Sequence, residues 1–252
     1  ARLSRLVVNG LVGATGLRPT LAAVDGGARL ALANKESMVL AGDLVMRRAR
    51  ESGAEIIPVD SEHSGVFQCL AGGDIDDVER LTLTASGGPL RLHPDWRRAT
   101  PAEVLAHPVW DMGPRITTDS ATMLNKGLEV IEAHWLFGLD YDRIGVLIHP
   151  QAAVHALVEW RDGSVIAQLS TPDMQLPSQG ALSWPERLTA PLERLQLGAI
   201  GQLEFAEAPL ERYPCLTIAL EAGREGGLAP VVLNAADEIA VELFHSGRIQ
   251  LG

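Results

Sequence analysis

The sequence predicts an α/β fold in which a parallel sheet is followed by a mixed sheet and then by helices. Between residues 29 and 59 a short apolar strand, an amphipathic helix and a second strand follow one another with short connections, a pattern typical of a parallel sheet. Further along, the pair Asp162–Gly163 separates two strand-like segments and predicts a β-hairpin. We therefore expect an antiparallel part to follow the parallel one.

Composition limits the class of protein. The 252 residues leave room for one large domain or two ordinary ones, and 46% hydrophobic residues suffice for a core. The net charge of −11 argues against nucleic-acid binding, which needs a basic surface. Cys69 and Cys215 have no metal-binding spacing and fit a reducing compartment. We expect a cytoplasmic protein with neither a membrane span nor a signal peptide.

The first half of the chain is expected to alternate strands and helices. Gly13–Gly16 lacks the three-glycine nucleotide fingerprint, so it predicts a turn or close helix packing. Thr100–Glu103 has the pattern of a capping box with proline at the first helical position, which predicts a short helix. The remaining elements expected here are strands over 29–33, 55–59 and 80–84 and a helix over 36–50.

The second half begins with a strong helical pattern that Asp119 or Ser120 would open and Gly138 would end. Its core-facing stripe is formed by Leu124, Leu128, Ile131 and Trp135. The stretch 185–214 has four prolines and weak periodicity, which predicts a linker. The other elements expected here are strands over 144–148, 154–160 and 164–169 and helices over 215–222 and 230–245, ending at Gly223 and Gly247.

Two carboxylates stand at the end of the strand over 55–59. Asp60 and Glu62 are two residues apart, so on an extended strand end they point the same way. Two such carboxylates need a proton or a cation between them, and an all-oxygen pair suits Mg²⁺ or Mn²⁺. The alternative is that Asp60 or Ser61 caps the next helix and Glu62 complements its dipole.

Other polar groups lie at positions where parallel sheets bind ligands. Asn34, Lys35 and Glu36 also follow a strand. Ser86 precedes two glycines, which suits an anion-binding loop or a plain turn. Asn125 and Glu129 share one helix face beside Lys126, and that face could equally be solvated.

A loop over 107–116 carries large apolar residues without a periodic face. Trp110 and Met112 in this loop form either a packed plug or a lid over a ligand. Together with a nucleotide-type sheet, the carboxylates Asp60, Glu62 and Glu129 and the anion-binding candidates indicate metal-assisted chemistry on a sugar phosphate.

Five segments, in order and spacing, closely resemble the 1-deoxy-D-xylulose 5-phosphate reductoisomerase family. They are 32–37 (LANKES), 58–63 (PVDSEH), 84–89 (TASGGP), 119–129 (DSATMLNKGLE) and 148–151 (IHPQ). The resemblance covers essentially the whole chain. It implies an enzyme dependent on NADPH and on Mg²⁺ or Mn²⁺, with Co²⁺ as a further option. Such an enzyme rearranges 1-deoxy-D-xylulose 5-phosphate and reduces the intermediate aldehyde to 2-C-methyl-D-erythritol 4-phosphate, in the non-mevalonate route to isoprenoids.

The resemblance also implies roles for single residues. The metal ligands would be Asp60, Glu62 and Glu129. The phosphate and substrate contacts would be Ser86, Ser120, Asn125 and Lys126, with Lys35 and Ser61 on the substrate's oxygens, His107 at the base of the loop and Trp110 closing it.

The NADPH contacts would be Asn34, Glu36 and Gly113, with Met112 and Met174 lining the nicotinamide region. The catalytic residues implied are Lys35, Glu62, His107 and Glu129, and weaker candidates near the metal are His63 and His155.

The family's domain pattern implies four segments. They are the remainder of a Rossmann-type NADPH domain over 1–59, an α+β catalytic domain over 60–184, a linker over 185–209 and the start of a C-terminal helical domain over 210–252. The family's glycine-rich fingerprint lies upstream of residue 1, so we expect a fragment. A homodimer is implied, formed through the sheet around 144–170.

Some positions depart from the family. Ala152 and Ala156 stand where the family usually has serines, and Asp111 adds a negative charge to the loop. Two other functions fit the same residues: another metal-assisted oxidoreductase acting on a different phosphorylated hydroxyketone, or a non-catalytic subunit that binds a nucleotide or a metal.

Overall fold

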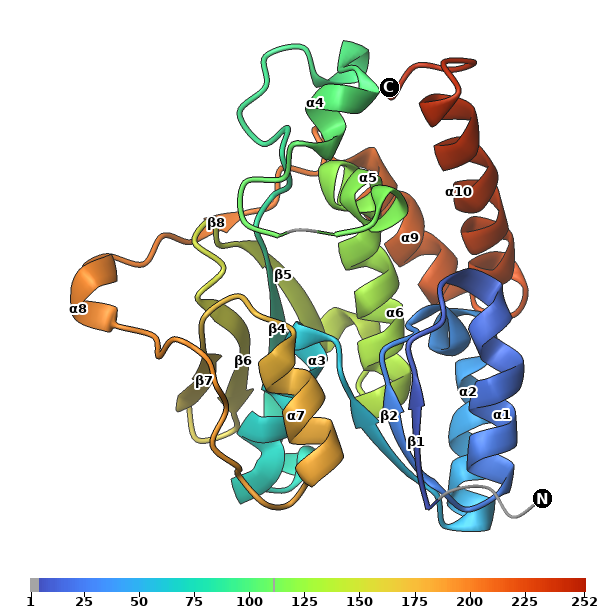
Figure 1. Cartoon of the computed structure of the whole chain (residues 1–252), viewed down its shortest axis with the longest axis vertical. Coiled ribbons are helices and arrows are strands. Elements are labelled where there is room, and N and C mark those ends of the chain that lie inside the picture. The colour runs from blue at the N-terminus through green and yellow to red at the C-terminus, as the bar shows by residue number, and fades with distance from the viewer. Residues whose placement is uncertain (1–4, 111) are drawn as a thin grey trace.

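Two separate β-sheets organise the structure, a computed structural model that describes residues 5–110 and 112–252 (Figure 1). The first sheet is parallel, with the order β1-β2-β3. The second is mixed, with the order β7-β6-β4-β5-β8, in which β4 is parallel to β5 and antiparallel to β6. The predicted α/β class, with a parallel sheet before a mixed one, is confirmed. Asp111 lies outside the described residues.

The parallel sheet and its helices come from the first part of the chain. Its strands are β1 (Leu6–Asn9), β2 (Arg29–Leu32) and β3 (Glu55–Pro58), connected by α1 (Leu17–Asp25) and α2 (Glu36–Ser52). Between β1 and α1 lies the 3-10 turn Gly13–Gly16, where a Cβ on Gly16 would lie 2.1 Å from Oδ1 of Asn34. The turn predicted at these glycines is therefore present, and Gly16 also packs closely against the Asn34 side chain.

The mixed sheet is built from later segments. Its strands are β4 (Val78–Ala85), β5 (Ile144–Ile148), β6 (Val154–Trp160), β7 (Val165–Leu169) and β8 (Ala206–Glu207). The helices of the same part are α3 (Ser61–Cys69), α4 (Pro101–Leu105), α5 (Pro114–Thr122), α6 (Leu124–Phe137), α7 (Gln175–Ser183), α8 (Leu197–Ile200), α9 (Pro214–Glu225) and α10 (Ala229–His245). Further 3-10 turns cover Leu70–Gly72, Ile75–Asp77, Trp96–Arg98 and Tyr141–Arg143.

Helix α6 is buried between the two halves of the molecule (Figure 1). Val130 packs with Leu81 of β4 in one apolar cluster, whereas Leu128 packs with Ala219 of α9 in another. A helix that is covered on several sides has little freedom to shift, because each face fits a different neighbour. The polar groups that α6 carries at its first two turns are therefore rigidly placed.

The single helix predicted from residue 119 to residue 138 is wrong. The chain forms α5 and α6, separated by Met123 in the left-handed region (φ 61°). Gly113 and Pro114 start α5, since proline suits the first helical position, so Asp119 and Ser120 lie inside that helix. Met123 is 2% exposed and packs with Ala85 and Ile148; this tertiary contact has no signal in the helical periodicity.

A further local prediction is corrected. Gly223 does not end α9, which runs on to Glu225 with Gly226 (φ 68°) after it. A Cβ on Gly223 would lie 2.7 Å from the Tyr141 ring, so this glycine serves close packing. The stretch 185–209 includes α8 and β8, and β8 pairs with β5. No helix among the described residues is long and apolar enough to cross a bilayer.

Candidate active site

A cavity of about 190 Å³ lies where β2, β3 and β4 end and α6 begins. Strand ends of parallel sheets commonly carry ligand sites, because the connections after them converge there. The cavity wall combines residues from segments that are far apart in the sequence. The predicted site residues on it are Lys35, Asp60, Ser61, Glu62, Ser86, Trp110, Met112, Ser120, Asn125, Lys126, Glu129 and Met174.

Three carboxylates gather at one end of this cavity. Asp60, Glu62 and Glu129 each offer an oxygen, and these oxygens lie within 4.8 Å of one another. Asp60 precedes α3 but its side chain forms no capping hydrogen bond with the described residues. It pairs with Lys35 instead, with 2.5 Å between Oδ2 and Nζ. The capping alternative therefore does not account for the Asp60 side chain.

Two ammonium groups neutralise part of this negative charge. Lys35 Nζ lies 2.7 Å from Asn125 Oδ1 and 3.0 Å from Glu129 Oε1, in addition to its pair with Asp60. Lys126 Nζ lies 2.5 Å from Glu62 Oε1 and also bonds Glu129. These are the only two lysines in the chain. Buried charges require partners, so both lysines are committed to the carboxylates.

The solvated face considered for the start of α6 is not observed. Lys126 is 4% exposed and Glu129 is 1% exposed. Asn125 lines the cavity and donates a hydrogen bond to Glu129. Polar residues on this face point inward because the ends of β2 and β3 lie against it.

The buried charges shift one another's proton affinities. Burial and the neighbouring Glu129 raise the pKa of Glu62 to about 7, against the opposing effect of Lys126. Burial alone would raise the pKa of Asp60, but Lys35 and, less strongly, His63 hold it well below its usual range. Burial would lower the pKa of Lys126, yet Glu129 and Glu62 raise it. A pKa of about 7 means that the Glu62 carboxyl is partly protonated at neutral pH.

The cavity wall also presents hydroxyl groups, those of Ser61, Ser86 and Ser120. The Ser86 hydroxyl accepts hydrogen bonds from His107 Nε2 at 3.0 Å and from the Gly88 amide at 3.1 Å. Its own hydrogen is thereby left to donate to a ligand. Gly87 and Gly88 both have positive φ, and a Cβ on Gly88 would lie 2.4 Å from the Ser120 carbonyl oxygen. The turn at Ser86 therefore requires glycine and brings Ser86 close to α5.

His107 also anchors the loop that carries Trp110. Its Nδ1 accepts hydrogen bonds from the amides of Val109 and Trp110, at 3.2 and 2.9 Å. Burial lowers the pKa of His107, which favours the neutral ring that can accept at Nδ1 and donate at Nε2. Trp110 and Met112 line the cavity, and the Trp110 ring lies 6.3 Å from that of His155.

The residues predicted to contact NADPH separate into two groups. Met112 and Met174 line the cavity. Asn34, Glu36 and Gly113 are absent from its wall. Asn34 donates to the Leu11 and Gly13 carbonyl oxygens at 2.8 and 3.0 Å, and Glu36 accepts from the Gly13 amide at 3.0 Å. Both side chains hold the connection after β1, beside the cavity rather than inside it.

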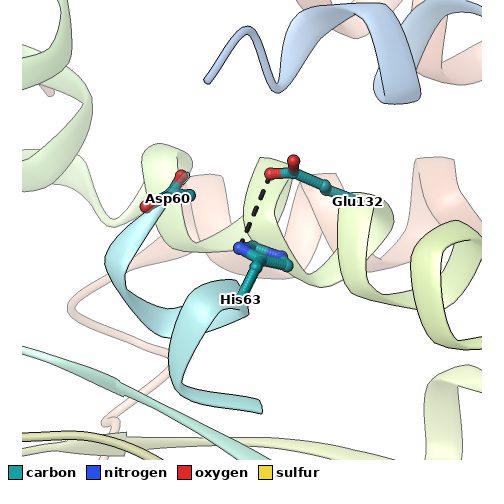
Figure 2. A group of neighbouring side chains, drawn as sticks. All are labelled: Asp60, His63 and Glu132. Carbon is teal, nitrogen blue, oxygen red and sulfur yellow. Dashed lines mark ion pairs between the residues drawn. The ribbon is translucent and has the colours of Figure 1, made fainter. Parts of the chain in front are cut away.

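A second group of possible metal ligands shares Asp60. It consists of Asp60, His63 and Glu132, whose ligand atoms lie within 4.8 Å of one another (Figure 2). Burial, and to a lesser degree Asp60, raise the pKa of Glu132 to about 7, with His63 acting in the opposite direction. Glu132 was missed in the sequence, although its position three residues after Glu129 puts both on one helix face. His155, a weaker candidate, is 4% exposed and belongs to neither group.

Another missed residue is Arg115, which connects three parts of the structure. Its guanidinium lies 2.8 Å from Asp237 Oδ2 and 2.9 Å from Glu238 Oε1 on α10, and 3.5 Å from Glu36 Oε1. Glu36 thus serves an ion pair as well as the connection after β1. No sequence pattern relates residue 115 to residue 237, so this network needed the fold.

The fold and cavity define an α/β protein with a buried site of carboxylates, ammonium groups and hydroxyls. Three family descriptions match successive parts of the chain. They are 1-deoxy-D-xylulose 5-phosphate reductoisomerase over residues 2–42, the C-terminal domain of that enzyme over 56–137 and the DXP reductoisomerase C-terminal domain over 169–252.

Individual relatives agree with the family descriptions. The 1-deoxy-D-xylulose 5-phosphate reductoisomerase of Gloeobacter violaceus is 56% identical over 252 residues, covering 98% of this chain and 64% of the relative. That of Moorella thermoacetica is 57% identical over 248 residues, with the same two coverages. The chain therefore belongs to the 1-deoxy-D-xylulose 5-phosphate reductoisomerase family, and the resemblance found in its motifs is confirmed. It spans 64% of the length of these curated relatives.

Solved structures give the same result for the fold. A crystal structure described as DOX-P reductoisomerase in complex with NADPH, fosmidomycin and magnesium has a TM-score of 0.94 and 46% identity, covering 98% of this chain and 63% of that one. The reductoisomerase of Zymomonas mobilis in complex with NADPH has a TM-score of 0.92 and 42% identity, covering 98% and 65%.

Proposed function

We propose that this chain forms the metal- and substrate-binding part of an NADPH- and divalent-metal-dependent oxidoreductase. Its reaction would be the isomerisation and reduction of 1-deoxy-D-xylulose 5-phosphate to 2-C-methyl-D-erythritol 4-phosphate, in the non-mevalonate route to isoprenoids. The observation that carries the proposal is the group Asp60, Glu62 and Glu129, which shares one cavity with both lysines of the chain. The related structures bound to NADPH and magnesium support the same two cofactors here.

The three carboxylates fit a hard divalent cation. They are all-oxygen ligands, they converge within 4.8 Å, and their three negative charges exceed the two positive charges of Lys35 and Lys126. Mg²⁺, Mn²⁺ or Co²⁺ bound there would polarise the substrate carbonyl and stabilise negative charge on the neighbouring oxygens during rearrangement. Lys35 and Ser61, on the same wall, are the groups proposed to orient those oxygens.

Lys126 has a role that depends on the carboxylates beside it. In this structure Glu62 and Glu129 hold its ammonium group. Once these carboxylates act as metal ligands, Lys126 loses partners and can bind the substrate phosphate together with Asn125, Ser86 and Ser120. His107 orients the Ser86 hydroxyl for this contact, and Trp110 excludes water from the reacting atoms.

The ends of β1 and β2 fit one wall of a dinucleotide site. Leu11 and Val12, which follow β1, are 50% and 72% exposed, and Asn34 and Glu36 fix the backbone beside them. Exposed apolar groups at such a strand end suit a cofactor ring or ribose. NADPH bound along this wall would supply the hydride, and the groups proposed to contact it there are Met112 and Met174, which line the cavity, and Gly113 at the start of α5.

The domain boundaries and the assembly are also proposals. We propose the segments 1–59, 60–184, 185–209 and 210–252 as the remainder of the NADPH domain, the catalytic domain, the linker and the start of the helical domain. We also propose a cytoplasmic location and a homodimer formed through the sheet around 144–170, and β7 supports the dimer. This strand is at the edge of the described sheet, and its Val165 and Ile166 are 55% and 45% exposed.

NADPH consumption by a purified full-length version of the protein tests the proposed function. With 1-deoxy-D-xylulose 5-phosphate and Mn²⁺ we expect turnover, and we expect Glu129→Gln to lower kcat/KM by roughly 100-fold or more, since it removes a metal ligand. No turnover of this substrate by the unaltered protein contradicts the proposal. Turnover of only a different phosphorylated hydroxyketone supports another oxidoreductase, and cation binding without turnover supports a non-catalytic subunit.

The two lysines provide an independent test of the site. With ¹⁵N-labelled lysine, the protein has only two Nζ signals to resolve. We expect Mg²⁺ to shift both, because both ammonium groups contact the proposed ligands. Inorganic phosphate added afterwards should shift the Lys126 signal, identified by its loss in Lys126→Arg. Signals that do not respond to Mg²⁺ contradict the three-carboxylate site.

A further inference from the structure

His63 is oriented by contacts on both sides of its ring. Its Nε2 lies 2.9 Å from the Glu129 carbonyl oxygen, which can only accept, so Nε2 carries the hydrogen. The ring stacks on Phe137, with centroids 6.2 Å apart and planes 11° from parallel. In the neutral ring, Nδ1 is therefore a bare acceptor, and it faces Glu132 (Figure 2).

Glu132 and His63 Nδ1 have no hydrogen-bond partner among the described residues. Both carboxylate oxygens of Glu132 are buried without a hydrogen bond from the described residues, their one close charged neighbour being His63 at 3.6 Å, and the side chains of Glu132 and His63 are 0% exposed. Asp60 is the third member of the group. The ligand atoms of the three groups lie within 4.8 Å of one another, and at His63 Nδ1 and Glu132 a buried acceptor without a hydrogen bond is costly. Such an arrangement requires a proton or a metal cation between its members.

The distance between His63 and Glu132 favours a metal cation over a shared proton. His63 Nδ1 and Glu132 Oε2 are 3.6 Å apart, which is longer than the 2.7–3.2 Å typical of N–H···O hydrogen bonds. Two ligands held at about 2.1 Å by one metal ion lie about 3–3.5 Å apart, which is close to this separation. A histidine that binds a metal also donates its other ring N–H to a carbonyl or carboxylate, as His63 does to Glu129.

The charges around the group leave room for a further cation. Lys35 is the nearest ammonium group, and it bonds Asp60, Asn125 and Glu129 but not Glu132. Around Asp60 there are then four carboxylates against two lysines. Because Asp60 lines the cavity, an ion can reach the buried pair from there.

We propose that Asp60, His63 and Glu132 bind a second divalent cation, with Asp60 shared between this ion and the one at the three carboxylates. The imidazole nitrogen selects a first-row transition metal such as Co²⁺ over Mg²⁺, because Mg²⁺ prefers oxygen ligands. The proposal depends on the proposed function only through the shared Asp60. It adds a site whose metal preference differs from that of the all-oxygen group.

Binding stoichiometry of the purified protein tests the second site. By titration calorimetry we expect one Mg²⁺ and two Co²⁺ per chain. His63→Gln and Glu132→Gln should each lower the Co²⁺ number from two to one and leave the single Mg²⁺ in place. The visible spectrum of the Co²⁺-loaded protein should lose one component in both variants. Either variant can carry the test if the other fails to fold in EDTA.

A matched histidine–glutamate pair on the surface is the control. His93 Nε2 lies 3.6 Å from Glu103 Oε1, at the same separation, with side chains 30% and 49% exposed. His93→Gln should keep two Co²⁺. The proposal is overturned if the unaltered protein binds only one Co²⁺, or if His63→Gln and Glu132→Gln both still bind two. It is also overturned if His93→Gln binds fewer than two Co²⁺. Failure of Mg²⁺ to bind, or to respond to Glu129→Gln, contradicts the proposed function instead.

Discussion

The two groups that share Asp60 differ in how their charges are paired. At Glu62 and Glu129 every carboxylate contacts a lysine ammonium or a neighbouring polar group. At His63 and Glu132 the side chains are more deeply buried, yet the facing atoms have no hydrogen-bond partner among the described residues. The first arrangement is stable without a metal ion, because the lysine ammonium groups supply the positive charge that a metal ion would otherwise provide. The second leaves buried acceptors unsatisfied until a cation arrives.

The largest effect is expected from Lys126→Met measured in EDTA. Removing Lys126 leaves Glu62 without an ammonium partner and Glu129 with Lys35 alone, and it should lower the free energy of unfolding by about 3–5 kcal/mol. Urea denaturation measures this change, and added Mg²⁺ should recover part of it. Arg48→Met is the control, because the Arg48–Asp25 pair is 38% and 50% exposed and should contribute only about 0–1 kcal/mol. Equal losses in the two variants would show that the buried lysine is not needed for pairing.

His155 is buried but belongs to neither group of possible metal ligands. It therefore shows how an ordinary buried histidine changes the stability of the protein with pH. Burial lowers its pKa to about 4, so between pH 6.5 and 4 the unfolded chain binds a proton that the folded chain does not. The contribution of His155 to the free energy of unfolding is fully present above pH 6.5. It decreases as the pH falls through 4, by about 3 kcal/mol in total. His155→Asn should flatten this part of the stability–pH curve. An unchanged slope would assign the acid sensitivity to other groups.

Identical substitutions one turn apart on α6 test the comparison directly. In EDTA, Glu129→Gln should cost about 2 kcal/mol, because both lysines lose a charged partner. Glu132→Gln should be neutral or stabilising, because it removes a buried charge without a hydrogen-bond partner among the described residues. Urea denaturation at pH 8 compares the two. A similar cost for both variants would mean that Glu132 is paired as fully as Glu129.

The smallest expected effect concerns a hydroxyl group on the cavity wall. Ser86→Ala removes a hydroxyl that His107 and Gly88 orient, and it should weaken binding of inorganic phosphate about tenfold, or about 1.4 kcal/mol. Titration calorimetry in saturating Mg²⁺ measures this, with the exposed Ser246→Ala as the control. Unchanged affinity would place the phosphate away from Ser86.

Local patterns in the sequence predicted most of the elements because their signals are local. The capping box at Thr100 and Glu103 forms as expected, and so does the hairpin after Trp160. The break at Met123 was not predictable, because it depends on packing against Ala85 and Ile148 from distant strands. The pairing of β8 with β5 depends on a contact nearly 60 residues apart and has no periodic signal in a two-residue strand.

The candidate site was predictable to a similar extent. Strand ends selected Lys35, Asp60 and Ser86, because a parallel sheet brings such positions together. Burial of Lys126 and Glu129 was not visible in α6 alone, where polar residues at helical spacing fit a solvated face equally well. Glu132 was missed for the same reason: only the fold puts His63 opposite it.

The most direct measurement for the three-carboxylate site is anomalous diffraction from crystals grown with Mn²⁺. We predict a peak at about 2.0–2.3 Å from oxygens of Asp60, Glu62 and Glu129, with Lys126 Nζ moved away from Glu62. No peak among these oxygens, with both lysines still on the carboxylates, would contradict the assignment of these residues as a metal site.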